Sequence, residues 1–184
     1  MSIPRKLLRQ HEITEAVTAL REAFSAIQRI RRSRPMGILV QLPKIPSILS
    51  ESIVASEVQH GRGPMWKGPV QVMPGGAKAD LIVKWKSKEF RVEVKGTGRQ
   101  GFQNLVAKDV AADVLVWVDF GNFFEDEFDS PVVAYWVSKP SSIFPDSMKI
   151  SLQNFRKRCG TALRARNIRI SSSSQRQRQF EEKA

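Results

Sequence analysis

Hydrophobic residues near the N-terminus recur with helical spacing. From His11 to Arg32 the chain lacks Gly and Pro, and apolar residues follow one another at alternating steps of four and three, which predicts an amphipathic helix. The stripe consists of Ile13, Val17, Leu20, Phe24 and Ile27. It has the period of a coiled coil but covers only about two heptads. We therefore expect it to pack on the rest of the domain, and a homodimer contact stays open.

A second helix is predicted from Ser47 to His60, between a proline and a glycine. On a helical wheel, Glu51 falls among apolar residues within one sector of about 120°, whereas Glu57 lies outside this sector. The sector holds Ile48, Glu51, Val54, Ala55 and Val58. Because an unpaired buried charge is very unfavourable, Glu51 requires a cation or a metal as partner.

Two segments with alternating side chains, Asp80 to Trp85 and Glu89 to Lys95, predict a β-hairpin. Apolar residues face one another across the hairpin when paired positions sum to 173. The apolar pairs in this register are Leu81 with Val92 and Val83 with Phe90. The hairpin therefore has one consistent core face.

The same register brings ionisable side chains together. Asp80 comes opposite Glu93, and Lys95 shares the face of Glu93 at about 7 Å along the strand. Facing carboxylates repel when ionised, and a hard cation such as Mg²⁺, which binds one or two carboxylates together with water and phosphate, relieves the repulsion. The alternative is an exposed hairpin in which Glu93 and Lys95 form a solvated ion pair. The apolar neighbours favour central strands, where Glu and Lys rarely lie without a partner or a function.

The remaining pattern predicts an α/β (α+β) fold with a single domain over residues 1–170. The other expected elements are an extended connector at 35–46, a short strand at 70–73, a helix at 102–111, buried strands at 113–120 and 131–137, and a basic C-terminal helix at 151–165. The polar segment 171–184, rich in Ser, Gln and Arg, is predicted to be disordered.

The order of these elements resembles the core of the PD-(D/E)xK nuclease superfamily. A helix with Glu51, a strand, a strand beginning at Asp80, a strand with Glu93-Val94-Lys95, a helix and a strand follow one another over residues 47–137. The resemblance implies a restriction-endonuclease-like core, a central mixed β-sheet flanked by helices, to which the N-terminal helix 11–32 and the basic C-terminal helix are additions. Ala79 stands where the name-giving proline would be.

The resemblance also implies roles for individual residues. Asp80 and Glu93 would bind Mg²⁺, for which Mn²⁺ would substitute, and the backbone carbonyl of Val94 would be a further ligand. Lys95 would be the catalytic lysine. Glu51 matches a helix glutamate of some branches that often reaches the metal through water, and Gln100 or Gln103 would correspond to a glutamine of other branches.

Charge is distributed unevenly in this chain of net charge +12. Residues 1–34 hold eight basic against three acidic side chains, 35–148 hold twelve against thirteen, and 149–184 hold ten against two. Basic flanks around a near-neutral middle favour a nucleic acid as partner, which is DNA in the nuclease hypothesis, with charge that only keeps the chain soluble, anionic membranes or acidic proteins as alternatives. The single cysteine, Cys159, and the lack of an apolar run of roughly 20 residues indicate a cytoplasmic, non-membrane protein.

Other chemistries find less support. Gly96-Thr97-Gly98 is not a nucleotide-binding loop, so no nucleotide cofactor is expected. His11, His60 and Cys159 are too isolated for a zinc site. The acidic residues at 125–129 lie between strands and are interpreted as a solvated loop.

Three functions stay open. The first is a Mg²⁺-dependent endonuclease acting on DNA, of the restriction, junction-resolvase or repair type. The second is a catalytically inactive DNA-binding or assembly module with the same fold. The third is a nuclease for RNA or branched DNA.

Overall fold

The computed structural model describes residues 6–33, 41–61, 70–76, 79–98, 101–125 and 130–170. Four α-helices lie in these ranges: α1 (Gln10–Ser33), α2 (Ser47–Gln59), α3 (Ala107–Val110) and α4 (Leu152–Cys159). The strands are β1 (Gln71–Pro74), β2 (Leu81–Trp85), β3 (Lys88–Gly98), β4 (Phe102–Leu105), β5 (Val114–Gly121), β6 (Val132–Ser138), β7 (Met148–Ser151) and β8 (Arg164–Ile168). Short 3-10 turns occupy 140–142 and 160–162. Gln100, the connector residues 35–40, the acidic residues 126–129 and the tail 171–184 lie outside the described ranges.

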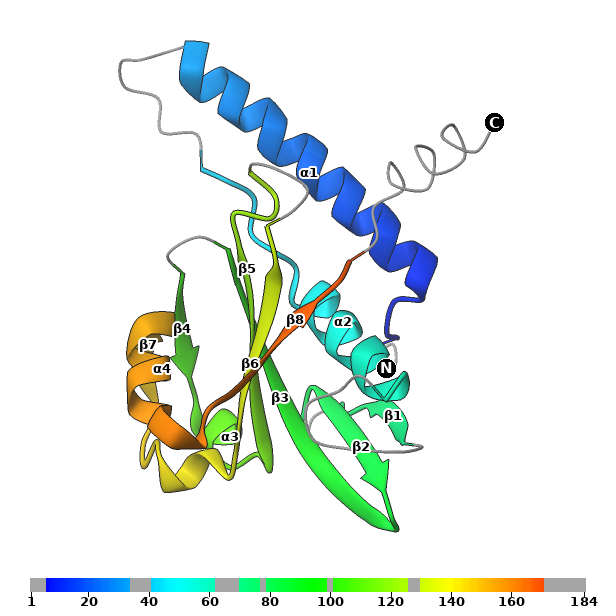
Figure 1. The fold of residues 1–184 in the computed structure, drawn as a ribbon, viewed down its shortest axis with the longest axis vertical. Coiled ribbons are helices and arrows are strands. Elements are labelled where there is room, and N and C mark those ends of the chain that lie inside the picture. Colours follow the sequence, from blue (N-terminus) through cyan, green and yellow to red (C-terminus); the bar gives the residue numbers. More distant parts are fainter. Residues whose placement is uncertain are drawn as a thin grey trace.

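Six strands form a central mixed sheet in the order β1-β2-β3-β5-β6-β8. β3 and β5 run parallel, and the other neighbouring strands are antiparallel. A separate two-stranded sheet pairs β4 with β7. Helices α1 and α2 lie on one side of the large sheet, and β4, β7 and α4 lie on the other (Figure 1). The expected mixed sheet flanked by helices is therefore present.

The predicted β2–β3 hairpin is confirmed together with its register. Leu81 pairs with Val92 and Val83 with Phe90, as the burial of apolar side chains on one face requires. The ladder closes at Trp85 and Lys88, so the turn has two residues, Lys86 and Ser87, both with positive φ (48° and 63°). Such turns match the right-handed twist of the strands.

The central sheet is buried on both faces because each face carries its own hydrophobic core. Alternate residues of β5 divide between them: Val114, Val116 and Val118 join the core under α1 and α2, whereas Leu115 and Trp117 join the core under α4. This explains why β5 reads as a continuous apolar run rather than an alternating one.

Helix α1 packs along its apolar stripe within this chain. Ile13, Val17 and Phe24 are buried, and Phe24 stacks on Phe124 with ring centroids 5.3 Å apart. The expected packing on the domain is thus confirmed for the stripe, and a homodimer stays a prediction. Among the described residues, none of the helices combines the length and the apolar character needed to cross a membrane.

Two predicted helices differ from the observed structure. Residues 102–111 were expected to be one helix, but Phe102–Leu105 form β4 and only Ala107–Val110 are helical, because pairing with β7 overrides the local helix preference. The basic helix predicted for 151–165 ends at Cys159, before Gly160 at φ +49°. Arg164–Ile168 then form an edge strand beside β6.

Candidate functional site

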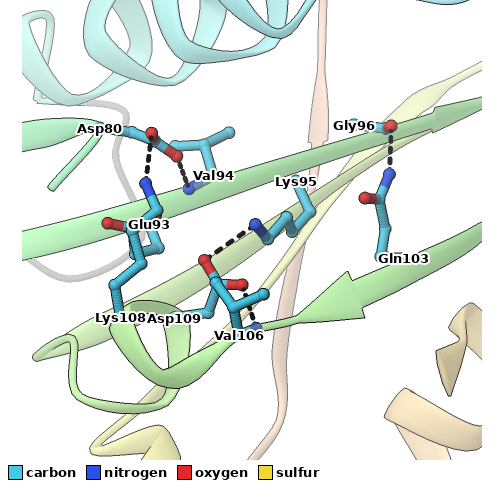
Figure 2. A network of polar contacts seen from close by, with 9 residues as sticks. All are labelled: Asp80, Glu93, Val94, Lys95, Gly96, Gln103, Val106, Lys108 and Asp109. Atoms are coloured by element: carbon cyan, nitrogen blue, oxygen red, sulfur yellow. Dashed lines mark hydrogen bonds and ion pairs between the residues drawn. The ribbon is translucent and has the colours of Figure 1, made fainter. Parts of the chain in front are cut away.

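Asp80 and Glu93 meet where the β2–β3 hairpin ladder ends. Asp80 directly precedes β2 and is 8% exposed, and Glu93 lies within β3 and is fully buried. Oδ2 of Asp80 accepts a 2.9 Å hydrogen bond from the backbone N–H of Val94, which fastens the Asp80 carboxylate to the strand that carries Glu93 (Figure 2). The apolar pairing of the hairpin therefore positions both carboxylates.

Lys108 of α3 contacts both of these carboxylates. Its Nζ lies 2.9 Å from Oε2 of Glu93 and 3.3 Å from Oδ1 of Asp80 (Figure 2). Its side chain keeps 47% of its surface exposed, so the ammonium group enters the pair from the solvent side. The cation that two facing carboxylates require is thus supplied by the chain itself.

Burial and charge act on Glu93 in opposite directions. Burial raises the pKa of Glu93 to about 7; the hydrogen bond from Lys108 opposes this rise, and the negative charge of Asp80 adds to it. For Lys108, burial favours the neutral amine, but the two carboxylates outweigh it and raise the pKa of Lys108 above its ordinary value. Lys108 is therefore held as a cation, while Glu93 gives up its proton near neutral pH.

Lys95 pairs with Asp109, a carboxylate that also lies beside Glu93 and adds to the rise in the pKa of Glu93. Its Nζ lies 2.8 Å from Oδ1 of Asp109, whose side chain is fully buried, while Lys95 itself is 16% exposed. Oδ2 of Asp109 accepts a 2.7 Å hydrogen bond from the N–H of Val106, at the start of α3. The short helix α3 therefore contributes two consecutive residues: Lys108 supplies one positive charge to the carboxylate pair, and Asp109 holds the lysine of β3.

Gln103 and Gly96 connect β4 to the strand that carries the site. Nε2 of Gln103 donates a 2.8 Å hydrogen bond to the carbonyl oxygen of Gly96 (Figure 2). On the other face of β3, a Cβ at Gly96 would overlap Oγ of Ser50 in α2. Gly96 therefore permits close packing of α2 on the sheet. Gln103 is hydrogen-bonded to the residue that follows Lys95 in β3, rather than to the carboxylates.

Glu51 belongs to the opposite side of the sheet. Glu93 and Lys95 pair with Leu115 and Trp117 of β5, which face the α4 core, whereas α2 packs on the other core. Glu51 is 1% exposed. Helix α2 is buried on nearly all sides, because it packs on the sheet with one side and contacts α1 with another. The role of Glu51 as a metal ligand, like that of the Val94 carbonyl, stays a prediction.

Sequence reasoning missed Lys108 and Asp109. Both fall inside the segment predicted to be a helix, and no hydrophobic periodicity distinguishes them. The repulsion between Asp80 and Glu93 did indicate that a cation is needed. It could not indicate that a lysine 15 residues after Glu93 supplies it, because this depends on the pairing of β4 with β7, which sets where α3 begins.

The donor set suits a hard divalent cation that keeps water or substrate ligands. Within the described part of the chain, Oε1 of Glu93 is buried and has no hydrogen-bond donor. In the same residues no three His, Cys, Asp or Glu side chains form a metal cage. A metal held by Asp80 and Glu93 would thus complete its shell with water and phosphate, as Mg²⁺ commonly does. Comparisons with protein-family models, with curated proteins and with solved structures find no match to this chain.

Proposed function

We propose that this protein is an endonuclease that hydrolyses DNA phosphodiester bonds with Mg²⁺ held by Asp80 and Glu93. The observation that carries the proposal is the meeting of these two carboxylates, one buried in a central strand and the other hydrogen-bonded to it. The chain order α2, β1, β2, β3, β4, α3, β5 supports the likeness to the PD-(D/E)xK core, with β4 as an additional strand before α3. Glu51 and the Val94 carbonyl belong to the proposal as further ligands.

The residues divide the chemical work as follows. Mg²⁺, when bound, lowers the pKa of a coordinated water and neutralises charge on the phosphate oxygens. Asp80 and Glu93 hold the metal and fix its position against the sheet. Lys95, oriented by Asp109, would supply an ammonium group beside the scissile phosphate, where it would stabilise the charge that develops on the phosphate oxygens.

Charge supports DNA as the substrate. Helix α4 packs on the same face of the sheet as Glu93 and Lys95, and it presents three exposed basic residues, Arg156, Lys157 and Arg158. Lys149 of β7 is exposed beside it. Basic side chains next to a phosphodiesterase site bind the phosphate backbone and release its counterions. An activity on DNA agrees with the cytoplasmic location expected for a chain with one cysteine.

Incubation with DNA tests the proposal. Linear duplex, supercoiled plasmid, single-stranded DNA and a four-way junction are each incubated with Mg²⁺, with and without a chelator, and with Asp80→Asn, Glu93→Gln and Lys95→Met. We expect metal-dependent cleavage by the wild type only, with DNA binding retained by the variants. Discrete bands, junction-only products or a smear would separate restriction, resolvase and general nuclease activities. Cleavage that persists with chelator would refute the proposal.

The alternative function is a catalytically inactive DNA-binding or assembly module. One observation favours it: Lys108 already offsets part of the negative charge of Asp80 and Glu93 without a metal. Calorimetric titration with Mn²⁺ discriminates between the two. Binding that is lost in Asp80→Asn and Glu93→Gln supports the nuclease, and no binding in the wild type supports the module.

A further inference from the structure

We infer that Lys108 is a resident counter-cation that competes with the divalent metal for Asp80 and Glu93 and so sets the metal affinity of the site. The inference rests on the proposed function, because it concerns the same two carboxylates. Its basis is geometric: one ammonium group lies 2.9 Å from Glu93 Oε2 and 3.3 Å from Asp80 Oδ1.

The ammonium and a metal cannot share this position. Mg²⁺ binds carboxylate oxygens at about 2.1 Å, so a metal bridging the oxygens that Lys108 contacts would occupy the space of its Nζ. Two cations in adjacent positions would also repel each other. A metal at Oε2 of Glu93 and Oδ1 of Asp80 therefore requires Lys108 to leave, and the free energy of the contacts that Lys108 makes with these oxygens is subtracted from the affinity for the metal.

The structure allows Lys108 to leave without disturbing the rest of the site. Its side chain is 47% exposed and extends along the solvent side, whereas the neighbouring Asp109 is fully buried and fastened to Lys95 and to the N–H of Val106. Displacement can therefore be a change of side-chain conformation in Lys108, with α3 staying in place. Lys95, bound to Asp109, keeps its position in both states.

The competition matters because it sets when the site is loaded. Two facing carboxylates without a cation would destabilise the folded protein, above all because Glu93 is fully buried. In the metal-free protein Lys108 supplies that cation. With a metal, that stabilisation is no longer needed. Lys108 thus makes the metal-free protein more stable and raises the metal concentration at which the site fills.

The test compares the Mn²⁺ affinity of the full-length wild type with that of Lys108→Met, which keeps an apolar side chain of similar length but removes the charge. Lys84→Met is the matched control, since Lys84 is similarly exposed (44%) and also forms an ion pair, 3.1 Å from Glu89. Glu93→Gln reports on binding at other positions. Affinity is measured by calorimetry, and the Mn²⁺-induced rise in Tm is measured in parallel.

We expect Lys108→Met to bind Mn²⁺ about tenfold more tightly than the wild type, with a larger rise in Tm on metal addition, and Lys84→Met to match the wild type. Equal or weaker Mn²⁺ binding by Lys108→Met would overturn the inference about Lys108. The proposed metal site would still stand in that case, provided that the wild type binds Mn²⁺ through Asp80 and Glu93. Mn²⁺ binding that survives Glu93→Gln unchanged, or none in the wild type, would instead refute the metal site itself, and the inference with it.

A measurement on the wild type covers the case in which Lys108→Met does not fold. Acetylation of individual lysines by a limiting reagent is followed by mass spectrometry with and without saturating Mn²⁺. Released from its carboxylates, Lys108 should react several-fold faster when metal is present, whereas Lys84 should not change. An unchanged rate at Lys108 under saturating Mn²⁺ would contradict the inference.

Discussion

Oδ1 of Asp109 lies 2.8 Å from Nζ of Lys95, and Asp109 is fully buried while its other oxygen accepts the N–H of Val106. A buried carboxylate held at two points leaves the lysine little freedom. In the proposed reaction Asp109 is therefore a positioning residue, acting through Lys95 rather than on the substrate.

Asp109→Asn keeps an acceptor for Val106 but removes the charge that holds Lys95. We expect the single-turnover rate of DNA cleavage at saturating Mn²⁺ to fall about 10- to 100-fold, as for residues that orient groups of a metal site, while KM for DNA changes little. Asp113→Asn, which alters an exposed pair with Arg91, serves as the control. A wild-type rate in Asp109→Asn would remove Asp109 from the mechanism.

The stability of the metal-free protein should depend on pH through Glu93. Its pKa is about 7 in the folded chain against an ordinary value of 4.5, so the folded state binds the proton more tightly than the unfolded state does. Tighter proton binding by Glu93 in the folded state adds to the free energy of unfolding. This addition is fully present below about pH 4.5 and is lost as the pH rises through 7. The difference amounts to roughly 3 kcal/mol at most.

Urea unfolding in the presence of a chelator, at intervals from pH 5 to pH 8, measures this contribution. We expect the free energy of unfolding to decline across this range in the wild type and to decline less in Glu93→Gln, which carries no titrating group at this position. If the free energy of unfolding declined equally with pH in the two proteins, Glu93 would not have the raised pKa.

Close packing at Gly96 predicts a strong effect of one methyl group. A Cβ there would overlap Oγ of Ser50 and lie 3.0 Å from its Cβ, so Gly96→Ala should destabilise the protein by about 1–3 kcal/mol. Gly98→Ala in the same strand is the control, because its Cβ would meet only Ile45 Cδ1 at 3.6 Å. Equal stabilities for the two variants in urea unfolding would contradict this account of the α2–β3 contact.

Cys159 should be unreactive in the folded protein. It is buried in the core under α4, and burial raises the pKa of its thiol to about 11, so the reactive thiolate is scarce at pH 8. We expect slow reaction with an aromatic disulfide reagent under native conditions and rapid reaction in denaturant. A Ser141→Cys, Cys159→Ala protein, with its thiol at an exposed position, should react rapidly in both. Fast native labelling of Cys159 would argue against its burial.

The sequence by itself determined the part of the site that depends on local alternation. Only one register of the β2–β3 hairpin buries Leu81 with Val92 and Val83 with Phe90 on one face, and this register carries Asp80 to Glu93. The helix stripe of α1 was predictable for the same reason, because burial of apolar side chains imposes a period on adjacent residues.

Only the tertiary structure decided which residues complete the site. Phe102–Leu105 becomes a strand because it pairs with Met148–Ser151, more than 40 residues further along the chain, and that pairing sets where α3 begins. The position of α3 in turn brings Lys108 between Asp80 and Glu93 and Asp109 onto Lys95. Long-range pairing of this kind leaves no local period in the sequence, so charge balance could require a cation but could not identify Lys108.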